Sequence, residues 1–105
     1  MSDVVWTAEA LARLDDIKAY IANDSPAAAD EMIARLLART RQLETAVLSG
    51  RQVPDYQRDD IRELLERPYR IIYQLGPDRV EILTVMHYRQ LLPRKAELLQ
   101  KITED

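Results

Sequence analysis

The 105-residue sequence contains no cysteine, two glycines and a single histidine, His87. The lack of cysteine excludes disulfides, thiolate catalysis and cysteine-based zinc sites, and a lone histidine excludes a histidine-cluster metal site. No apolar run approaches the roughly 20 residues that a membrane span needs, and the N-terminus lacks the basic and apolar regions of a secretion signal. We therefore expect a cytoplasmic protein without a metal or other cofactor.

Basic side chains are outnumbered by acidic ones, and the net charge is −3. An acidic chain is a poor general binder of nucleic acid. The charge is uneven, however: the first fifty residues carry eight acids against five bases, whereas residues 61–95 carry seven bases against four acids. The second stretch predicts either an anion-facing surface or ordinary solvated charge. With 47% hydrophobic residues, residues 1–105 are expected to form one globular domain.

Three runs rich in β-forming residues predict a three-stranded antiparallel meander. They cover Ile61–Glu66, Tyr69–Leu75 and Val80–Tyr88. Gly76-Pro77-Asp78-Arg79 suits a type I turn, because proline pre-sets φ at the second position. If Gly76 and Arg79 close this hairpin, Tyr73 pairs with Ile82, Ile72 with Leu83 and Arg70 with Val85.

This register predicts which side chains share a face of the sheet, because side chains alternate along a strand. Arg70 and His87 are then diagonal neighbours on one face, within reach of long side chains. Tyr88 falls on the opposite face. A similar two-residue turn at Arg67-Pro68 adds alternate residues of the first meander strand, Ile61, Glu63 and Leu65, to the face of Arg70.

The first half of the chain predicts a strand and a helical hairpin. Val4-Val5-Trp6 is typical of an edge strand, and Thr7 caps a helix that ends near Asn23. Ser25 and Pro26 are the N-cap and first residue of a second, longer helix. Residues that recur at helical spacing mark the inner face of each helix. They are Leu11, Leu14, Ile17 and Ile21 in the first helix, and Met32, Ile33, Leu36, Leu37, Thr40, Leu43 and Val47 in the second.

Two further segments complete the expected α+β fold. Residues 49–55 are expected to be a loop. Pro93 can open a short C-terminal helix that carries Leu98, Leu99 and Ile102.

The order of strand, helical hairpin, meander and tail, together with several local motifs, resembles the RelE/ParE superfamily of bacterial toxins over nearly the whole chain. The motifs are Gly50–Asp55, Arg62-Glu63-Leu64, Tyr69-Arg70-Ile71-Ile72-Tyr73 and Ile82–His87. The resemblance implies a toxin held inactive by an antitoxin encoded beside it. RelE-like members cut mRNA on the ribosome, whereas ParE-like members poison DNA gyrase.

For RNA cleavage, the resemblance implies a set of three residues. Arg70 matches the phosphate-binding arginine of the Tyr-Arg-x-x-Tyr motif, His87 with Tyr88 matches the His-Tyr pair of the YoeB-like branch, and Asp55 falls near that branch's loop carboxylate. Such a set could supply the cation, acid and base that cleavage at a 2′-hydroxyl needs. The lysines of RelE-like members, however, appear here as Ile61 and Glu63.

The missing lysines and the acidic charge favour the ParE-like branch, with ribosome-dependent mRNA cleavage and a non-toxic protein-binding relative as alternatives. Each candidate also has a structural interpretation: Arg70 could pair with Glu63 or Glu81, Asp55 could serve a turn, and His87 could be a packed strand residue. For the antitoxin we expect an apolar groove beside the helical hairpin and a basic sheet edge. The expected contact residues are Leu11, Leu14, Arg62, Arg70, Arg89, Leu98 and Leu99.

Overall fold

The computed structural model describes residues 2–90 and 97–99, and it confirms the expected α+β fold. Within those residues the strands form one sheet of order β1-β5-β4-β3-β2, in which β1 runs parallel to β5 and the other neighbours are antiparallel. The elements in chain order are β1 (Asp3–Trp6), α1 (Ala8–Ala22), α2 (Pro26–Arg41), the 3-10 turn η1 (Gln42–Glu44), β2 (Arg51–Gln52), the 3-10 turn η2 (Pro54–Tyr56), β3 (Ile61–Glu66), β4 (Tyr69–Leu75) and β5 (Arg79–His87). Residues 97–99 are helical.

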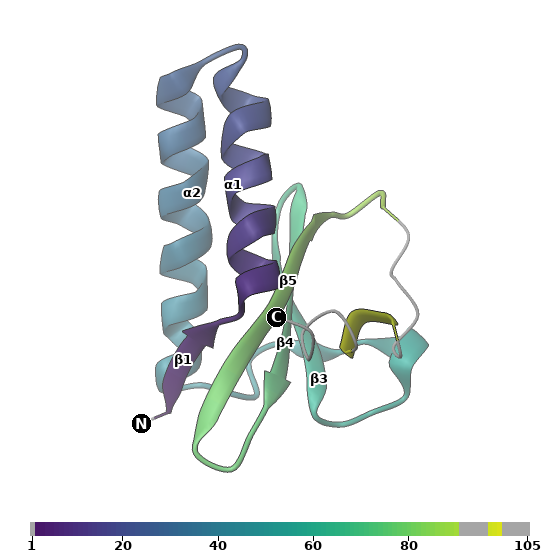
Figure 1. The fold of residues 1–105 in the computed structure, drawn as a ribbon. Coiled ribbons are helices and arrows are strands. Elements are labelled where there is room, and N and C mark those ends of the chain that lie inside the picture. The colour runs from purple at the N-terminus through teal and green to yellow at the C-terminus, as the bar shows by residue number, and fades with distance from the viewer. Residues whose placement is uncertain (1, 91–96, 100–105) are drawn as a thin grey trace.

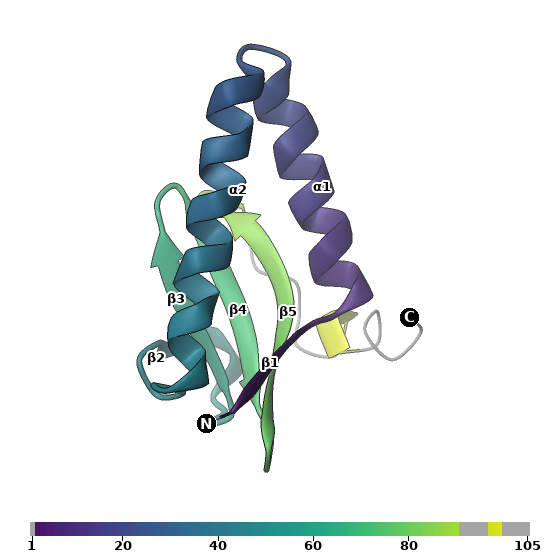
Figure 2. The same ribbon diagram turned by 90° about the vertical axis from the view of Figure 1, so that its left-hand side faces the viewer.

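The helices α1 and α2 form an antiparallel hairpin that lies on one face of the sheet, and its tip projects past the strands (Figures 1 and 2). Both helices begin at the expected caps. Thr7 Oγ1 accepts the Ala10 N–H at 3.1 Å, and Ser25 Oγ accepts the Ala28 N–H at 3.1 Å. Thr7 Oγ1 also donates to the Ile82 carbonyl at 2.8 Å, which ties the start of α1 to β5. The second helix is shorter than expected, because the chain tightens into η1 after Arg41.

The loop expected at residues 49–55 contains two short elements. Arg51 and Gln52 pair with Glu63 and Arg62 as the edge strand β2, and η2 follows directly. The hairpin between β3 and β4 has the expected two-residue turn at Arg67-Pro68, with a cis peptide bond. Leu65 therefore pairs with Arg70, which puts it on the face of Arg70 as predicted.

The hairpin between β4 and β5 follows the predicted register only near its turn. Tyr73 pairs with Ile82 as expected, but Ile72 then pairs with Thr84, and a β-bulge leaves Leu83 without its own partner. Because one extra residue on a strand reverses the faces beyond it, the predicted pairings of Ile72 with Leu83 and of Arg70 with Val85 are wrong. Arg70 pairs with Met86 instead.

The reversed faces separate Arg70 from His87. His87 pairs with Tyr69, so its side chain is on the face of Tyr69, which packs in the core beneath the helices. Arg70 follows Tyr69 and points to the opposite face. The expectation that Arg70 and His87 share a face is therefore wrong, although they do lie on adjacent antiparallel strands.

The core has two parts, one on each face of the sheet. The larger one lies under the hairpin and includes Leu14, Ile17 and Leu36 from the helices. The smaller one, on the other face, joins Val53 and Tyr56 to Ile61, Ile72, Leu83 and Leu98. In Figure 1 the turn of helix at 97–99 lies on this second side, opposite α1 and α2. Pro93 and Ile102 lie outside the described residues.

The sheet covers much of the apolar face of the helical hairpin. The partly buried Ile21, Met32, Ile33, Leu37 and Val47 all pack against the larger core. Val4 and Trp6 of β1 pack there too, so the parallel strand widens the platform under the helices. Within the described residues, the helices are too short or too polar to cross a membrane.

Candidate functional site

A cavity of about 840 Å³ opens at one end of the sheet. Short segments that are distant in sequence converge on it: β2, η2, β3, the β3–β4 turn, β4 and the residue after β5. Its lining consists of Arg51, Pro54, Asp55, Glu63, Leu65, Arg67, Pro68, Tyr69, Arg70 and Tyr88. The alternating strand residues Glu63, Leu65 and Arg70 show that the cavity lies on the sheet face away from the helices.

The Glu63 carboxylate is the buried centre of this site. Its side chain is 0% exposed, and both of its oxygens accept hydrogen bonds. Arg51 Nε donates to Oε1 at 2.8 Å, and Arg70 Nε donates to Oε2 at 2.9 Å. Arg70 Nη2 also donates to Oε2. A buried carboxylate held by two guanidinium groups keeps its charge compensated, which burial alone would not allow.

The two arginines of this Arg51–Glu63–Arg70 cluster differ in their contact with solvent. The Arg70 side chain is 14% exposed and that of Arg51 is 66% exposed. Arg51 donates to Glu63 through Nε alone, so its terminal nitrogens are not used by Glu63. Arg70 is thus mainly a structural partner, whereas Arg51 also presents charge to the cavity.

The walls of the cavity combine positive charge with apolar surface. Three arginines against two carboxylates, Asp55 and Glu63, give a formal charge of one positive. Among the residues that the structure describes, the Arg67 guanidinium has no hydrogen bond or ion pair, and it is exposed. Leu65 and Tyr88 are 43% and 49% exposed. The site therefore suits an anionic group that carries an apolar body.

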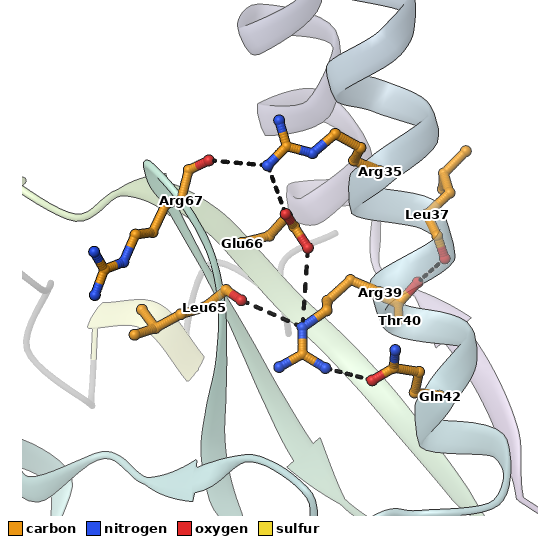
Figure 3. Close-up of polar contacts among 8 residues, drawn as sticks. All are labelled: Arg35, Leu37, Arg39, Thr40, Gln42, Leu65, Glu66 and Arg67. Atoms are coloured by element: carbon orange, nitrogen blue, oxygen red, sulfur yellow. Dashed lines mark hydrogen bonds and ion pairs between the residues drawn. The ribbon is translucent and has the colours of Figure 1, made fainter.

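The helix α2 fixes the β3–β4 end of the cavity from behind. Arg35 Nη2 donates to Glu66 Oε2 at 2.7 Å and to the Arg67 carbonyl, and Arg39 Nε donates to the Leu65 carbonyl at 3.3 Å. Figure 3 shows these carbonyls turned toward α2, while the side chains of Leu65 and Arg67 point away from it. The helix thus holds the backbone and leaves both side chains for the cavity.

Tyr73 anchors the segment that carries Arg51. The phenol donates to the Val47 carbonyl at 2.8 Å and accepts the Gly50 N–H at 3.0 Å. Burial raises the pKa of Tyr73, so it stays a neutral donor. A Cβ on Gly50 would lie 2.6 Å from the Tyr73 hydroxyl and 2.5 Å from the Glu63 carbonyl oxygen, so only glycine fits here.

A second tyrosine, Tyr56, is close enough to the cluster to be influenced by the charge of Arg70. Burial raises the pKa of Tyr56, and the nearby Arg70 charge opposes that shift. Tyr56 packs in the smaller core with Val53, so η2 is fixed to the sheet and Asp55 is carried to the cavity rim.

Two of the three residues expected for RNA cleavage lie in this cavity, and the third does not. Arg70 and the exposed Asp55 line it. His87 lies on the other face, edge-to-face with Tyr69 at 5.8 Å between ring centroids and stacked on Tyr88 at 4.8 Å. His87 Nδ1 accepts the Arg89 N–H at 3.1 Å. Tyr88, expected away from Arg70, lines the cavity instead.

The residues expected to contact an antitoxin do not form one surface. Leu14 and Leu98 are buried in opposite cores, and Leu99 packs beside Leu98. Arg62 shares the face of Tyr73, and its Nη1 donates to the Gly50 carbonyl at 3.0 Å, whereas Arg70 is held by Glu63. The exposed members are Leu11, on α1, and Arg89, which lies beside Tyr88. Burial excludes Leu14 and Leu98 as ready-made contact residues.

Several cavity residues were not predicted as site residues. Arg51, Arg67 and Leu65 were given no role in a site, and Glu63 entered as a possible partner of Arg70 and as a position where RelE-like members carry lysine. The predicted β3–β4 register already places Glu63, Leu65 and Arg70 on one face, and this was the available signal. Arg51 could not be placed, because its strand β2 has only two residues.

The chain is similar to toxin sequences over most of its length. The family model "ParE toxin of type II toxin-antitoxin system, parDE" matches residues 4–92. The candidate toxin Y4kP of Sinorhizobium fredii is 43% identical over 91 residues, covering 85% of this chain and 91% of that protein. Toxin RelE2 of Caulobacter vibrioides is 37% identical over 95 residues, covering 87% of this chain and 100% of that protein.

A solved structure shares the fold. It is described as the chromosomal ParDE toxin–antitoxin system from P. aeruginosa, and it aligns with a TM-score of 0.69 at 24% identity, covering 83% of this chain and 96% of that one. The match of the family model over most of the chain decides the family assignment. The protein belongs to the ParE toxin family of type II toxin–antitoxin systems.

Proposed function

We propose that this ParE-family toxin arrests growth by inhibiting DNA gyrase in the cytoplasm, and that a cognate antitoxin neutralises it. The observation that carries the choice of gyrase is the separation of Arg70 from His87. RNA cleavage requires a cation, an acid and a base around one phosphate. In this chain the Arg70 cation is bound to Glu63, and the only imidazole is on the other face of the sheet.

The charge distribution supports the same choice. A toxin that docks into ribosomal RNA gains affinity by neutralising phosphates, and this chain has a net charge of −3. The first meander strand carries Ile61 and Glu63, both buried, on the sheet face away from the helices (the open face), where RelE-like members carry lysines. Glu63 also compensates the positive charges of Arg51 and Arg70 through its two ion pairs.

Ribosome-dependent mRNA cleavage is the second candidate, because Asp55, Arg70 and Tyr88 do meet in one cavity. A relative that has lost toxicity and binds only protein is the third. For neutralisation, the exposed Leu11 on α1 and the cavity described above are two of the surface features available to an antitoxin.

Two assays on the same purified protein separate the candidates. We expect the protein to inhibit supercoiling by gyrase and to leave mRNA intact on programmed ribosomes, as read by run-off translation with primer extension. Cleaved mRNA with unaffected gyrase would overturn the proposal in favour of the second candidate. The cellular control is expression with and without the antitoxin encoded beside the gene: growth arrest that co-expression relieves is expected, and unaffected growth favours the third candidate.

A further inference from the structure

We propose that the cavity beside the Arg51–Glu63–Arg70 cluster is a recognition site for one acidic residue of a partner protein, flanked by an apolar residue. The proposal rests on the proposed function only in naming that partner as the antitoxin. The Glu63 carboxylate already accepts hydrogen bonds from Arg51 Nε and Arg70 Nε, which shows that arginines at this site can hold a carboxylate. A second carboxylate would bind the outer donors.

Those outer donors are Arg51 and Arg67. The terminal nitrogens of Arg51 remain free of Glu63, because only Nε donates to it. The exposed Arg67 guanidinium has no partner among residues 2–90 and 97–99. The two lie at the same cavity, on the segment after α2 and on the β3–β4 turn. Arginine pairs are suited to carboxylates, since each guanidinium can donate two parallel hydrogen bonds.

The apolar side chains of the cavity predict which kind of residue stands next to the acidic residue in the partner. Leu65 and Tyr88 are large and exposed, and they line the same cavity as the arginines. Exposed apolar side chains that surround a charged pocket are typical of a protein-binding site. An aliphatic side chain adjacent to the acidic one can cover Leu65, so the recognised unit is a short acidic–aliphatic segment.

The charges of the cavity favour a peptide over a nucleic acid. Asp55 and Glu63 both belong to the lining, so a chain of phosphates would meet two carboxylates as well as the arginines. With one formal positive charge, the cavity matches a single carboxylate. The net charge of −3 further opposes a polyanion.

Titration of the isotopically labelled full chain, followed by the NMR signals of the arginine Nε–H groups, tests the site directly. The probe is N-acetyl-leucyl-glutamate amide, and its matched control is the glutamine analogue. We expect saturable shifts of the Arg51 and Arg67 signals and of the Leu65 amide, with a Kd on the order of 1 mM, as is usual for so small a contact. The glutamine analogue is expected to bind at least three-fold more weakly.

Two variants assign the shifts to the cavity. Arg67→Ala is expected to weaken binding of the probe about three- to five-fold, as for one partly exposed charge pair. Arg41→Ala is the matched control, because Arg41 is exposed on α2 and has no ion pair among the described residues; it should leave binding unchanged. Glu63→Gln, if its thermal unfolding remains cooperative, should tighten binding, because one competing carboxylate charge is removed.

Four results would overturn the proposal. Equal binding of the glutamine analogue would show that the carboxylate is not recognised. Inorganic phosphate that gives the same shifts at equal affinity would indicate a general anion site. Equal losses in Arg67→Ala and Arg41→Ala would place binding elsewhere, and shifts that grow with protein concentration alone would show that a second copy of the chain fills the cavity. None of these readouts depends on toxicity, so failure here is distinct from failure of the gyrase assay.

Discussion

The strand β3 carries two glutamates, one on each face of the sheet. Each glutamate forms ion pairs with two arginines. Glu63, on the open face, is 0% exposed and is held by Arg51 and Arg70. Glu66, on the helix face, is 22% exposed; Arg35 lies 2.7 Å and Arg39 4.0 Å from it. The same residue types thus form a buried cluster on one side and a partly solvated one on the other.

The difference in burial decides what each cluster contributes. Breaking a buried ion pair leaves a desolvated charge without compensation, which costs several kcal/mol, whereas exposed pairs contribute about 1 kcal/mol or less. We therefore expect the Glu63 cluster to contribute more to the free energy of unfolding than the Glu66 cluster. The Glu66 cluster mainly orients the β3–β4 turn, through the carbonyls of Leu65 and Arg67 (Figure 3).

The largest effect is expected for Arg70→Met, which keeps the apolar stem and removes the charge. Glu63 would then have only Arg51, whose side chain is mostly exposed. We expect a loss of roughly 3 kcal/mol in the free energy of unfolding, measured by urea denaturation. Wild-type stability in this variant would show that Glu63 does not need Arg70.

A smaller loss is expected for Gly50→Ala, which disturbs the buried cluster without changing its charges. The added Cβ collides with the Tyr73 hydroxyl and the Glu63 carbonyl oxygen, so the chain next to Arg51 must shift. We expect a loss of about 1–3 kcal/mol, as for overpacking of a filled site. Thermal denaturation provides the measurement, with Gly76→Ala as the milder comparison: Gly76 is exposed, and its added Cβ would approach one backbone atom closely, the Arg79 carbonyl oxygen at 2.9 Å. Equal losses in the two would refute a special role for Gly50.

Arg35→Met probes the helix-face cluster and is expected to have a small effect. Arg35 is 46% exposed, and Arg39 remains near Glu66 after the change. We expect a loss below about 1 kcal/mol in urea denaturation. A loss as large as that of Arg70→Met would remove the distinction between the two faces.

The smallest effect concerns Asp60, a third carboxylate, which precedes β3 and is more exposed than the other two. Hydrogen bonds from Arg58, and then from Gln74, hold its pKa at about 2, against an ordinary 3.8. A carboxyl group whose pKa is lowered in the folded state stabilises the protein at pH values above its ordinary pKa. This contribution disappears as the pH falls from about 4 to 2. Because Asp60 is 34% exposed, we expect less than about 1 kcal/mol. Asp60→Asn should flatten the fall of Tm in that pH range, and an unchanged fall would contradict this role.

Much of the fold could be predicted because local signals agree with tertiary packing. Thr7 and Ser25 cap the helices as expected. The turns at Arg67-Pro68 and Gly76–Arg79 place the strands nearly to the residue, and Tyr73 pairs with Ile82. These caps and turns depend on the conformational preferences of a few neighbouring residues, and those residues can be identified from the sequence.

The candidate site was harder to predict because it depends on one bulge. Ile82 to Met86 are all buried, so their apolar pattern has no alternation that reveals which residue faces which side. No glycine or proline marks Leu83 as the extra residue. The resulting shift moved His87 away from Arg70 and brought Tyr88 into the cavity, and the role of Arg51 depended on a strand of two residues.

Two double-mutant cycles test the contrast between the faces most directly. One cycle combines Glu63→Gln with Arg70→Met, and the other combines Glu66→Gln with Arg35→Met, each followed by urea denaturation. The account predicts a coupling energy above about 1.5 kcal/mol for the buried pair and below about 0.5 kcal/mol for the helix-face pair. Equal couplings, or a larger one for Glu66 and Arg35, would contradict the conclusion that Arg70 serves the fold by compensating Glu63.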